Sequence, residues 1–347
     1  MKFTKFLIQW YLQNKRDLPW RSTQNPYFIW LSEIMLQQTR VAQGMPYFLS
    51  FTKAFPTIFD LANASEQEVL KLWQGLGYYS RARNLHKTAQ YIAFDLNGVF
   101  PNNYENLLLL KGVGDYTAAA IASFCFNEKV PVVDGNVFRV LSRYFDIETD
   151  ISLASTRKEF QNLALELMPQ NNPATFNQAI MEFGALQCVP KSPNCTICVM
   201  NTNCLALQKK KVNLLPVKSK KVKVTNRYLN YLVFEDDQLN TLISQRTDKG
   251  IWRNLYEFPL IETNEEQEFL SIISKIKEFA ILKNPIISIL ESNFKSQLHK
   301  LTHQNLYIKF WKIKIEGKIK NGIDYETLKT FPFPIVIYNF IENDFLE

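Results

Sequence analysis

The sequence has no stretch of about 18 uninterrupted apolar residues, the length that a membrane-spanning helix requires. Its first eleven residues, Met1–Tyr11, mix apolar and polar side chains and lack the small-residue cleavage site of a signal peptide. The sequence also lacks internal repeats, and low complexity is confined to the lysine-rich stretch Lys209–Lys223. We therefore expect a cytoplasmic protein with no membrane association and an amphipathic helix at its N-terminus.

The chain of 347 residues exceeds the usual size of one domain, and 46% apolar residues can fill substantial cores. Up to about residue 180 the signals are mostly helical, with Pro and Gly turns between them. Beyond the lysine-rich stretch, Arg227–Phe234, Thr241–Gln245 and Tyr307–Ile315 partly alternate as strands do, and 264–279 is typical of a helix. We predict an α domain at 1–205, a basic linker at 206–225 and an α+β domain at 226–347.

Acidic residues are absent from 205–228, which holds eight Lys and Arg residues. The net charge of +7 is therefore concentrated between two nearly neutral segments. Two interpretations stay open: a solvated tether, or a contact for phosphates whose affinity would fall steeply with salt.

A glycine-rich turn follows an apolar run at Leu107–Leu110 and precedes a helix of small residues. Gly112 and Gly114 allow the backbone to turn tightly and to approach a partner closely. The free N–H groups at the start of the next helix can then hold one phosphate without reading a base. Asp134 lies 20 residues further on, in a Gly-flanked corner between two apolar runs. An ordinary helical hairpin explains the glycines alone, but the hairpin together with the carboxylate is more specific.

Four of the five cysteines form the compact spacing Cys188-x6-Cys195-x2-Cys198-x5-Cys204. Disulfides are rare in cytosolic proteins, so four thiolates at this spacing indicate zinc or an iron–sulfur cluster. The spacing lacks the second Cys-x2-Cys of zinc ribbons, which favours a [4Fe–4S] cluster and leaves zinc as the alternative. Cys125 is expected to be an ordinary core residue.

Together, the hairpin, Asp134 and the cysteine set resemble the helix–hairpin–helix DNA glycosylases of the endonuclease III superfamily. Within it, the chain is most similar to the MutY family, which removes adenine opposite 8-oxoguanine. The resemblance covers essentially the whole chain and implies an all-α glycosylase domain with a cluster loop, followed by a Nudix (MutT-like) α+β domain. The segments that carry it are 18–21, 30–39, 75–85, 112–116, 133–136 and the four cysteines.

The resemblance implies two catalytic carboxylates. Glu33 lies in the apolar run Ile29–Leu36, where burial should raise its pKa and favour the acid form that protonates the leaving adenine. Asp134 would stay ionised beside the sugar, stabilising the oxocarbenium-like state electrostatically or by transient covalent attachment. Tyr116 stands where bifunctional relatives carry a lysine, so strand cleavage should be weak or absent.

The same resemblance assigns contacts to a flipped-out nucleotide and to the DNA around it. The residues are Trp20, Arg21 and Gln178 for the adenine pocket; Gln37, Gln38 and Tyr78 for the gap and the wedge beside the partner base; and Arg81, Arg83, Lys111, Gly112 and Gly114 for phosphates.

The segment Gly250–Pro259 resembles the opening of a Nudix domain. The Arg-Glu-x-x-Glu-Glu cluster that would hold magnesium is absent after it, so this domain should bind and not hydrolyse. In the MutY family a Phe-Ser-His loop reads 8-oxoguanine, and this chain has Leu301, Thr302 and His303. Thr302 keeps a hydroxyl, Leu301 replaces an aromatic, and an ordinary β-turn is the alternative.

We predict a monofunctional adenine DNA glycosylase with a [4Fe–4S] cluster, a monomer associated with the nucleoid. Its partner would be double-stranded DNA with adenine opposite 8-oxoguanine or guanine. Three alternatives are a thymine- or uracil-mismatch glycosylase, a non-catalytic DNA-binding protein and a nucleotide pyrophosphatase. The second domain argues against the first of these, and the missing magnesium cluster argues against the third.

Overall fold

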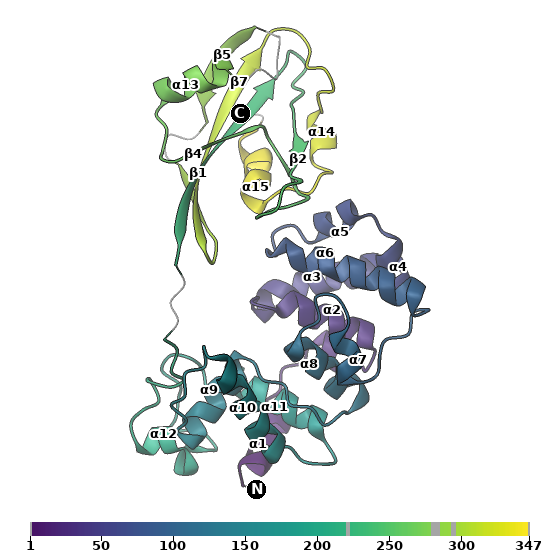
Figure 1. The fold of residues 1–347 in the computed structure, drawn as a ribbon, viewed down its shortest axis with the longest axis vertical. Coiled ribbons are helices and arrows are strands. Elements are labelled where there is room, and N and C mark those ends of the chain that lie inside the picture. The colour runs from purple at the N-terminus through teal and green to yellow at the C-terminus, as the bar shows by residue number, and fades with distance from the viewer. Residues whose placement is uncertain (1, 220–222, 279–284, 293–295, 346–347) are drawn as a thin grey trace. The chain divides into compact units, whose positions relative to one another are not determined.

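The computed structural model describes residues 2–219, 223–278, 285–292 and 296–345, which form two compact units (Figure 1). The first unit comprises Met1–Asn63 and Asn84–Lys220, and the second comprises Ala64–Arg83 and Lys221–Glu347. Part of the predicted linker, residues 220–222, lies outside the described residues. No described helix has both the length and the hydropathy needed to cross a bilayer.

The described part of the first unit is all helical, as the sequence predicts. Its elements are α1 (Lys2–Asn14), η1 (Pro19–Arg21), α2 (Pro26–Leu36), α3 (Val41–Ala54), α4 (Ile58–Asn63), the end of α6 (Tyr79–Gln90), η2 (Tyr91–Asp95), α7 (Tyr104–Leu108), α8 (Asp115–Phe126), α9 (Gly135–Phe145), α10 (Ala154–Leu167), α11 (Pro173–Leu186), η3 (Asn201–Asn203) and α12 (Leu205–Gln208).

Helix α2 forms the centre of one half of this unit. It begins where the Asn25 side chain accepts a hydrogen bond from Tyr27 N at 3.0 Å and Pro26 occupies the first helical position. Its apolar residues face all directions, which requires a buried helix, and α2 packs against α3 and α8. Because the apolar residues of α2 around Glu33 are buried, the Glu33 side chain lies in the interior as well.

A second core joins α1, α9, α10 and α11. Leu7, Val137, Phe160 and Phe176 are fully buried in it, and Cys188 and Cys198 pack against its edge. The cysteine-bearing loop is thus anchored on the same helices that follow Asp134.

The second unit contains a mixed five-stranded sheet in the order β4-β1-β7-β5, with β6 also paired to β7. Strands β1 and β7 are parallel and the other pairs are antiparallel. The elements are α5 (Glu66–Leu72), β1 (Thr225–Glu235), β2 (Ser244–Gln245), β3 (Tyr256–Glu257), β4 (Leu260–Thr263), α13 (Phe269–Glu278), β5 (Ile286–Glu291), β6 (Gln297–Lys300), β7 (Gln304–Ile315), α14 (Tyr325–Leu328) and α15 (Ile335–Asn343).

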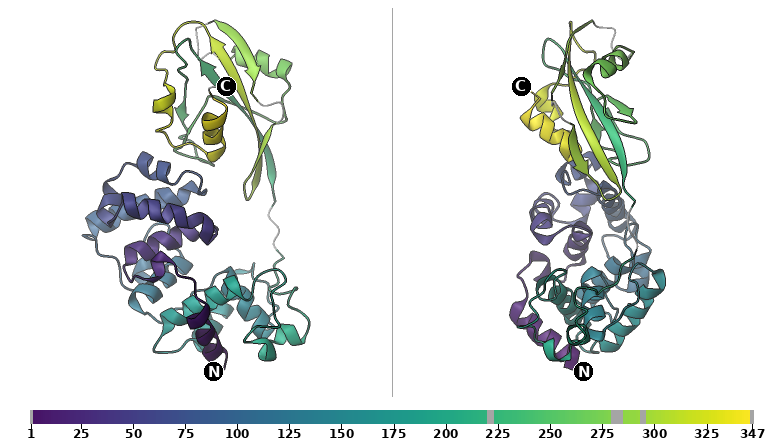
Figure 2. Two further views of the ribbon diagram at one scale, coloured as in Figure 1. Left: turned by 180° about the vertical axis from the view of Figure 1, so that it is seen from behind. Right: turned by 90° about the vertical axis from the view of Figure 1, so that its left-hand side faces the viewer.

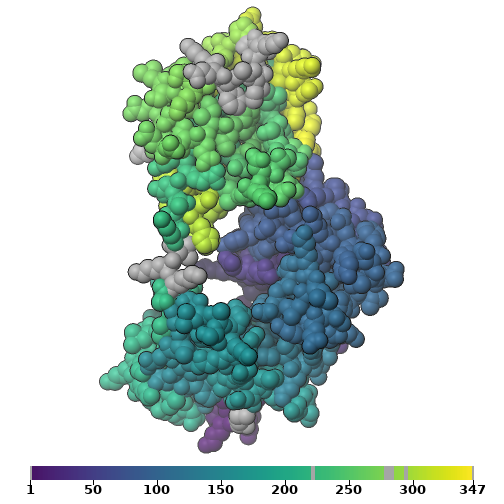
Figure 3. Space-filling model, in the orientation of Figure 1, coloured from purple at the N-terminus to yellow at the C-terminus, as the bar shows by residue number. Residues whose placement is uncertain are grey.

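Alternating residues of β7 bury opposite faces of this sheet. Trp311 packs with Ile272 of α13, while the ring of Phe310 stacks on Phe340 of α15 at 4.0 Å. Figure 2 shows α13 and α15 on opposite faces, and Figure 3 shows side chains around α13, in light green, covering one of them. The predicted α+β domain is confirmed.

The segment 64–83 belongs to the second unit in space, although it precedes the first unit's hairpin in sequence. Lys71 Nζ donates to the carbonyl of Phe331 at 3.1 Å and lies 4.8 Å from the centre of the Tyr338 ring. Gln74 accepts a hydrogen bond from Phe333 N at 2.9 Å. Nothing in the sequence pattern predicted this packing.

Candidate active site

Three helices of the first unit bring Glu33, Tyr116 and Asp134 together. Glu33 lies on α2, Tyr116 in the first turn of α8 and Asp134 at the start of α9. The Tyr116 hydroxyl is hydrogen-bonded to the Glu33 carboxyl group, and the charge of Asp134 acts on both. Buried Glu33 thus forms one cluster with two half-buried residues that follow it by 83 and 101 positions in the sequence.

The surroundings of Glu33 favour its protonated form. The side chain is only 7% exposed, and burial, followed by the nearby charge of Asp134, raises its pKa to about 7. The hydrogen bond from Tyr116 and the charge of Arg21 act in the opposite direction. A pKa near neutrality is suited to a group that gives and takes a proton.

Asp134 caps the N-terminus of α9. Its carboxylate accepts hydrogen bonds from Asn136 N at 2.8 Å, Val137 N at 2.9 Å and Asn136 Nδ2 at 2.7 Å. Burial raises its pKa, while these N–H groups and Arg139 oppose the increase. All of these partners are donors, which suits a carboxylate, so Asp134 is a helix cap and a charged member of the cluster at once.

Tyr116 contributes a neutral hydroxyl to the cluster. Burial and the neighbouring carboxyl groups of Glu33 and Asp134 raise its pKa well above the ordinary value. It therefore donates a hydrogen bond and offers no amine that could attack a sugar carbon.

Arg21 is held by a carboxylate that the sequence analysis missed. Glu182 of α11 is 1% exposed and accepts from Arg21 Nη1 at 2.9 Å and Nη2 at 2.7 Å. It also accepts from Arg16 Nε at 2.9 Å and Nη2 at 2.6 Å. Burial would raise the pKa of Glu182, but these hydrogen bonds outweigh it and lower the pKa to about 2. The sequence signal that could have identified Glu182 is its position as a single carboxylate within the apolar stretch of α11.

The other two residues predicted for the adenine pocket are Trp20, which precedes Arg21 in the chain, and Gln178, which is linked to Arg21 through Tyr11. Gln178, also on α11, accepts a hydrogen bond from the Tyr11 hydroxyl at 2.5 Å, and the Arg21 guanidinium lies 5.9 Å from the centre of the Tyr11 ring. Trp20 is buried and packs edge-on against Phe48.

A hydrogen-bonded relay links Asp134 to the cysteine loop through two further residues. Asn136, which donates to Asp134, accepts from Arg139 Nη2 at 2.8 Å. Arg139 Nε in turn donates to the carbonyl of Cys188 at 2.7 Å. The sequence gives no spacing signal for this relay, because Arg139 and Cys188 meet only in the fold.

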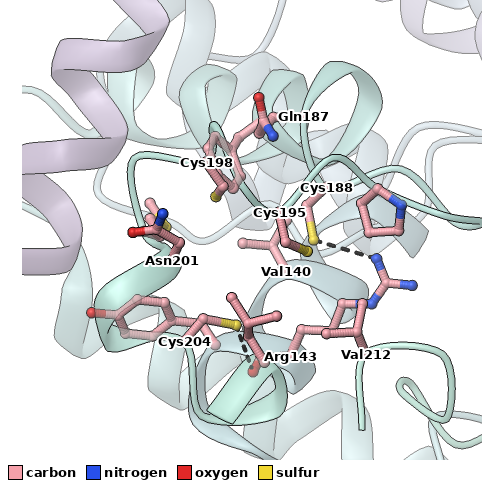
Figure 4. Close-up of a pocket in the computed structure, with 14 residues that line it drawn as sticks. Val140, Arg143, Gln187, Cys188, Cys195, Cys198, Asn201, Cys204 and Val212 are labelled. Atoms are coloured by element: carbon pink, nitrogen blue, oxygen red, sulfur yellow. Dashed lines mark hydrogen bonds between the residues drawn. The ribbon is translucent and has the colours of Figure 1, made fainter. Parts of the chain in front are cut away.

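The four cysteines of the 188–204 loop line one pocket (Figure 4). Arg143 Nη1 donates to the Cys188 sulfur at 3.4 Å and to the carbonyl of Val189 at 2.8 Å, which fixes the loop. Burial raises the pKa of Cys198 to about 11, which favours the neutral thiol in the absence of a bound cation. In the described part of the chain, no three His, Cys, Asp or Glu side chains are close enough to hold a single metal ion. The donor set, four thiols around a shared space, fits a multi-iron cluster.

The predicted hairpin is present between α7 and α8. Gly112 has φ +78°, and a Cβ there would lie 2.8 Å from Cβ of Asn84. Gly114 caps α8, and a Cβ there would meet no described atom within 4 Å. Lys111, Gly112 and Gly114 are exposed, so the hairpin tip can meet a partner.

Two residues predicted to enter the duplex adopt left-handed backbone conformations. Gln38, just after α2, has φ +55°, and Tyr78 has φ +50° with 44% of its surface exposed. Such conformations cost non-glycine residues about 1–3 kcal/mol and cluster at functional sites. Gln37 is fixed by its amide, which donates to the Thr117 hydroxyl at 3.1 Å.

The second unit brings Tyr78 to the loop predicted to read 8-oxoguanine. Leu301, Thr302 and His303 form the tip of the β6–β7 hairpin, where Leu301 N donates to the carbonyl of Gln304 at 2.8 Å. The hydroxyl groups of Tyr78 and Thr302 are hydrogen-bonded at 2.5 Å. Two residues predicted for neighbouring roles thus meet.

Arg81 and Arg83 have partners within the second unit. Arg81 lies 5.3 Å from the centre of the Tyr78 ring and donates to the carbonyl of Gly77 at 3.3 Å. Burial lowers the pKa of Arg81 to about 10. Arg83 donates to the carbonyl of Arg253 at 2.7 Å. Arg81 thus contacts the Tyr78 ring and Arg83 contacts the segment around Arg253, and the prediction of phosphate contacts included neither contact.

The basic segment is attached to the first unit at its start. Lys209 pairs with Asp146 at 2.7 Å, and Lys211 pairs with Asp146 and Glu148. Two of the cations considered for phosphate contact therefore already have carboxylate partners.

Comparison with known proteins agrees with this fold. Residues 31–170 match the HhH-GPD superfamily of base excision DNA repair proteins, and residues 230–343 match the NUDIX domain family. The adenine DNA glycosylase of Buchnera aphidicola subsp. Acyrthosiphon pisum is 35% identical over 88% of this chain and 92% of its own length. A solved thermostable thymine-DNA glycosylase, 31% identical, has a TM-score of 0.55 and covers 60% of this chain and 96% of its own. The solved structure of a non-covalent endonuclease III–DNA complex, 21% identical, has a TM-score of 0.53 and covers 60% of this chain and 96% of its own. At this identity the likeness shows the fold alone.

Fold, buried carboxylates and hairpin define a helix–hairpin–helix protein of base excision DNA repair. The chain belongs to the MutY-type adenine DNA glycosylases, in which an HhH-GPD domain is followed by a NUDIX domain. It is accordingly an N-glycosylase of the hydrolase class.

Proposed function

We propose that this chain removes adenine opposite 8-oxoguanine or guanine in double-stranded DNA by hydrolysis alone. The observation that carries this proposal is the buried cluster of Glu33, Tyr116 and Asp134, which contains a proton donor and a carboxylate but no amine. Hydrolysis of an N-glycosidic bond requires protonation of the base and stabilisation of positive charge on the sugar, and these two groups supply both.

Glu33 donates its proton to the adenine ring as the bond from the base nitrogen to the sugar carbon breaks. Asp134, held by three N–H donors, stabilises the positive charge on the sugar until a water oxygen bonds to that carbon. The water's proton then returns to Glu33, which is thereby restored. Tyr116 orients Glu33 and cannot form a Schiff base, so little or no strand cleavage accompanies excision.

Extrusion of adenine costs a few kcal/mol of unstacking, which protein contacts must offset. Arg21, fixed by Glu182, would line the adenine pocket together with Trp20 and Gln178. The left-handed backbone at Gln38 and at Tyr78 would present side chains suited to fill the gap, and Gln37, which precedes Gln38 in the chain, would assist there. The exposed tip with Lys111, Gly112 and Gly114 would hold a phosphate, and Arg81 and Arg83 would support the wedge and add positive charge to it.

Recognition of the opposite base is assigned to the β6–β7 hairpin of the second unit. Its support is the hydrogen bond between Thr302 and Tyr78, because a wedge beside the partner base and a hydroxyl that reads it have to be neighbours. Thr302 would bond to N7–H or O8 of the lesion, with Leu301 and His303 at its sides.

The cysteine loop would hold a [4Fe–4S] cluster through Cys188, Cys195, Cys198 and Cys204. Such a cluster, when bound, supplies positive charge that stabilises the four thiolates and cross-links the loop. Purified protein should be yellow-brown with four iron atoms per chain, as four Cys ligands imply. Colourless protein that contains zinc would contradict this assignment.

The functional division that fits these roles is 1–205 for excision, 206–225 as linker and 226–347 for lesion recognition, in a monomer. A cytoplasmic, nucleoid-associated location is part of this proposal. Residues 64–83, which carry the proposed wedge residue Tyr78, pack within the second unit. The wedge would therefore serve both excision and lesion recognition.

A mismatch glycosylase acting on thymine is the second candidate, because a thymine-DNA glycosylase has the fold of the first unit. That structure is matched over 96% of its length by 60% of this chain, which leaves the second unit unexplained. The deciding experiment measures release of free adenine and free thymine from duplexes that carry each mispair.

The variant Glu33→Gln tests the assigned acid in the same assay. Loss of positioned acid–base catalysis should slow adenine release by ~10²–10⁴-fold, while affinity for the mispaired duplex is retained. Undiminished release by Glu33→Gln, or release of thymine in place of adenine, would refute the proposal.

A further inference from the structure

A cavity of about 700 Å³ lies in the first unit, and its lining does not include Glu33, Tyr116 or Asp134. It is bordered by the end of α1, the residues around η1, the end of α8 and the start of α11. Its volume is within the range of ~300–1,000 Å³ that small-molecule sites occupy.

The inner wall of this cavity is shared with the proposed adenine pocket. Arg21 and Gln178 line the cavity, and Tyr11, hydrogen-bonded to Gln178, lies between them. Cys125 lines it too, and burial, followed by the charge of Glu33, raises the pKa of the Cys125 thiol. The cavity therefore shares Arg21 and Gln178 with the proposed adenine pocket.

The outer wall of the cavity is exposed. Lys15, Asn127 and Asn172 all line it with side chains open to solvent. Cys125 follows Tyr116 by nine residues on α8, which corresponds to about 14 Å along the helix axis. The hairpin tip lies at the opposite end of α8, so the cavity opens away from Lys111, Gly112 and Gly114.

We infer that this cavity is the route by which the excised purine base leaves while the DNA is still bound. The inference rests on the proposed function: once the base–sugar bond is broken, a neutral adenine is left behind a sugar that covers the DNA side of the pocket. Amide and hydroxyl groups from Asn172, Thr175 and Gln178 can exchange hydrogen bonds with the edges of a purine. A polar lining holds such a base weakly, as an exit requires.

Exchange of a fluorescent free base tests this route. Wild-type protein is saturated with a duplex that carries a tetrahydrofuran abasic analogue opposite 8-oxoguanine, and binding and release of free 2-aminopurine are followed by fluorescence. The blocking variants are Ala174→Trp and Thr175→Trp, both at half-buried positions on the cavity wall. Ala174→Ser is the matched control, because it keeps the cavity open.

We expect wild type and Ala174→Ser to exchange the base with DNA bound, and the two tryptophan variants to exchange it at least about tenfold more slowly, equivalent to a barrier ~1.4 kcal/mol higher. Affinity for the duplex serves as the folding check for each variant. If DNA abolishes exchange in wild type, if no base binds, or if both tryptophan variants exchange like wild type, the inference is wrong. Adenine release from a mispaired duplex is measured in parallel; its absence in wild type would instead refute the proposed function.

Discussion

At the scale of single residues, two buried glutamates of the first unit have pKa values that are shifted in opposite directions. Glu182 faces the guanidinium groups of Arg16 and Arg21, and its pKa falls to about 2. Glu33 faces a phenol and a second carboxyl group, and burial raises its pKa to about 7. The neighbours decide which glutamate anchors an arginine and which can move a proton.

The raised pKa of Glu33 sets the expected pH dependence of excision. The reaction requires the protonated form, which is present below pH 7 and declines above it. Single-turnover excision should therefore fall with increasing pH beyond about 7, approaching tenfold per unit. The residual rate of Glu33→Gln should lack this decline, and a wild-type rate that stays level up to pH 9 would contradict the assignment.

Asp134 combines a cap and a charge, and substitutions can separate them. Asparagine keeps the oxygen that accepts from Asn136 N and Val137 N but loses the bond from the Asn136 amide, so Asp134→Asn should retain most of the cap's contribution to stability but lose most excision activity. Asp134→Ala should lose activity and also about 0.5–2 kcal/mol of stability, measured by denaturant unfolding. Near-normal excision by Asp134→Asn would mean that Asp134 is only a helix cap.

At the scale of elements, the sequence patterns were sufficient where a local signal existed. The apolar run around Glu33 predicted a buried helix, and Gly112 and Gly114 predicted the turn before α8. The role of Glu182 could not be predicted, because its partners lie more than 160 positions away. Long-range pairing of polar groups leaves no periodic signal in the chain.

The two hairpin glycines should respond differently to alanine. Gly112→Ala forces a side chain into a left-handed backbone beside Asn84, so we expect a loss of at least about 1 kcal/mol in the free energy of unfolding. Gly114→Ala has space in the free protein, so its stability should be unchanged while affinity for any duplex falls. Full DNA affinity in a stable Gly114→Ala protein would remove the hairpin from the phosphate contacts.

At the scale of the whole molecule, the segment 64–83 connects the two proposed tasks. It precedes the hairpin of the first unit in sequence, yet it packs with the sheet domain and places Tyr78 against Thr302. The sequence could predict each of these residues from its own motif. It could not predict that they touch, because 224 positions separate them.

Removal of the Thr302 hydroxyl should alter the choice of opposite base more than the chemistry. Thr302→Val keeps the shape of the side chain, so excision opposite guanine should change little. Excision opposite 8-oxoguanine should lose ~5–30-fold in kcat/KM, the cost of about 1–2 kcal/mol for one hydrogen bond. Equal losses opposite both bases would show that Thr302 acts only by supporting the loop.

The central claim is that a protonated Glu33 and a charged Asp134 excise adenine without an amine. It is tested most directly by measuring free adenine and strand breaks from duplexes with adenine opposite 8-oxoguanine, guanine or cytosine, with and without alkali. The account predicts adenine release opposite 8-oxoguanine and guanine but not cytosine, and strand breaks only after alkali. Strand breaks that appear without alkali at the rate of base release would contradict it.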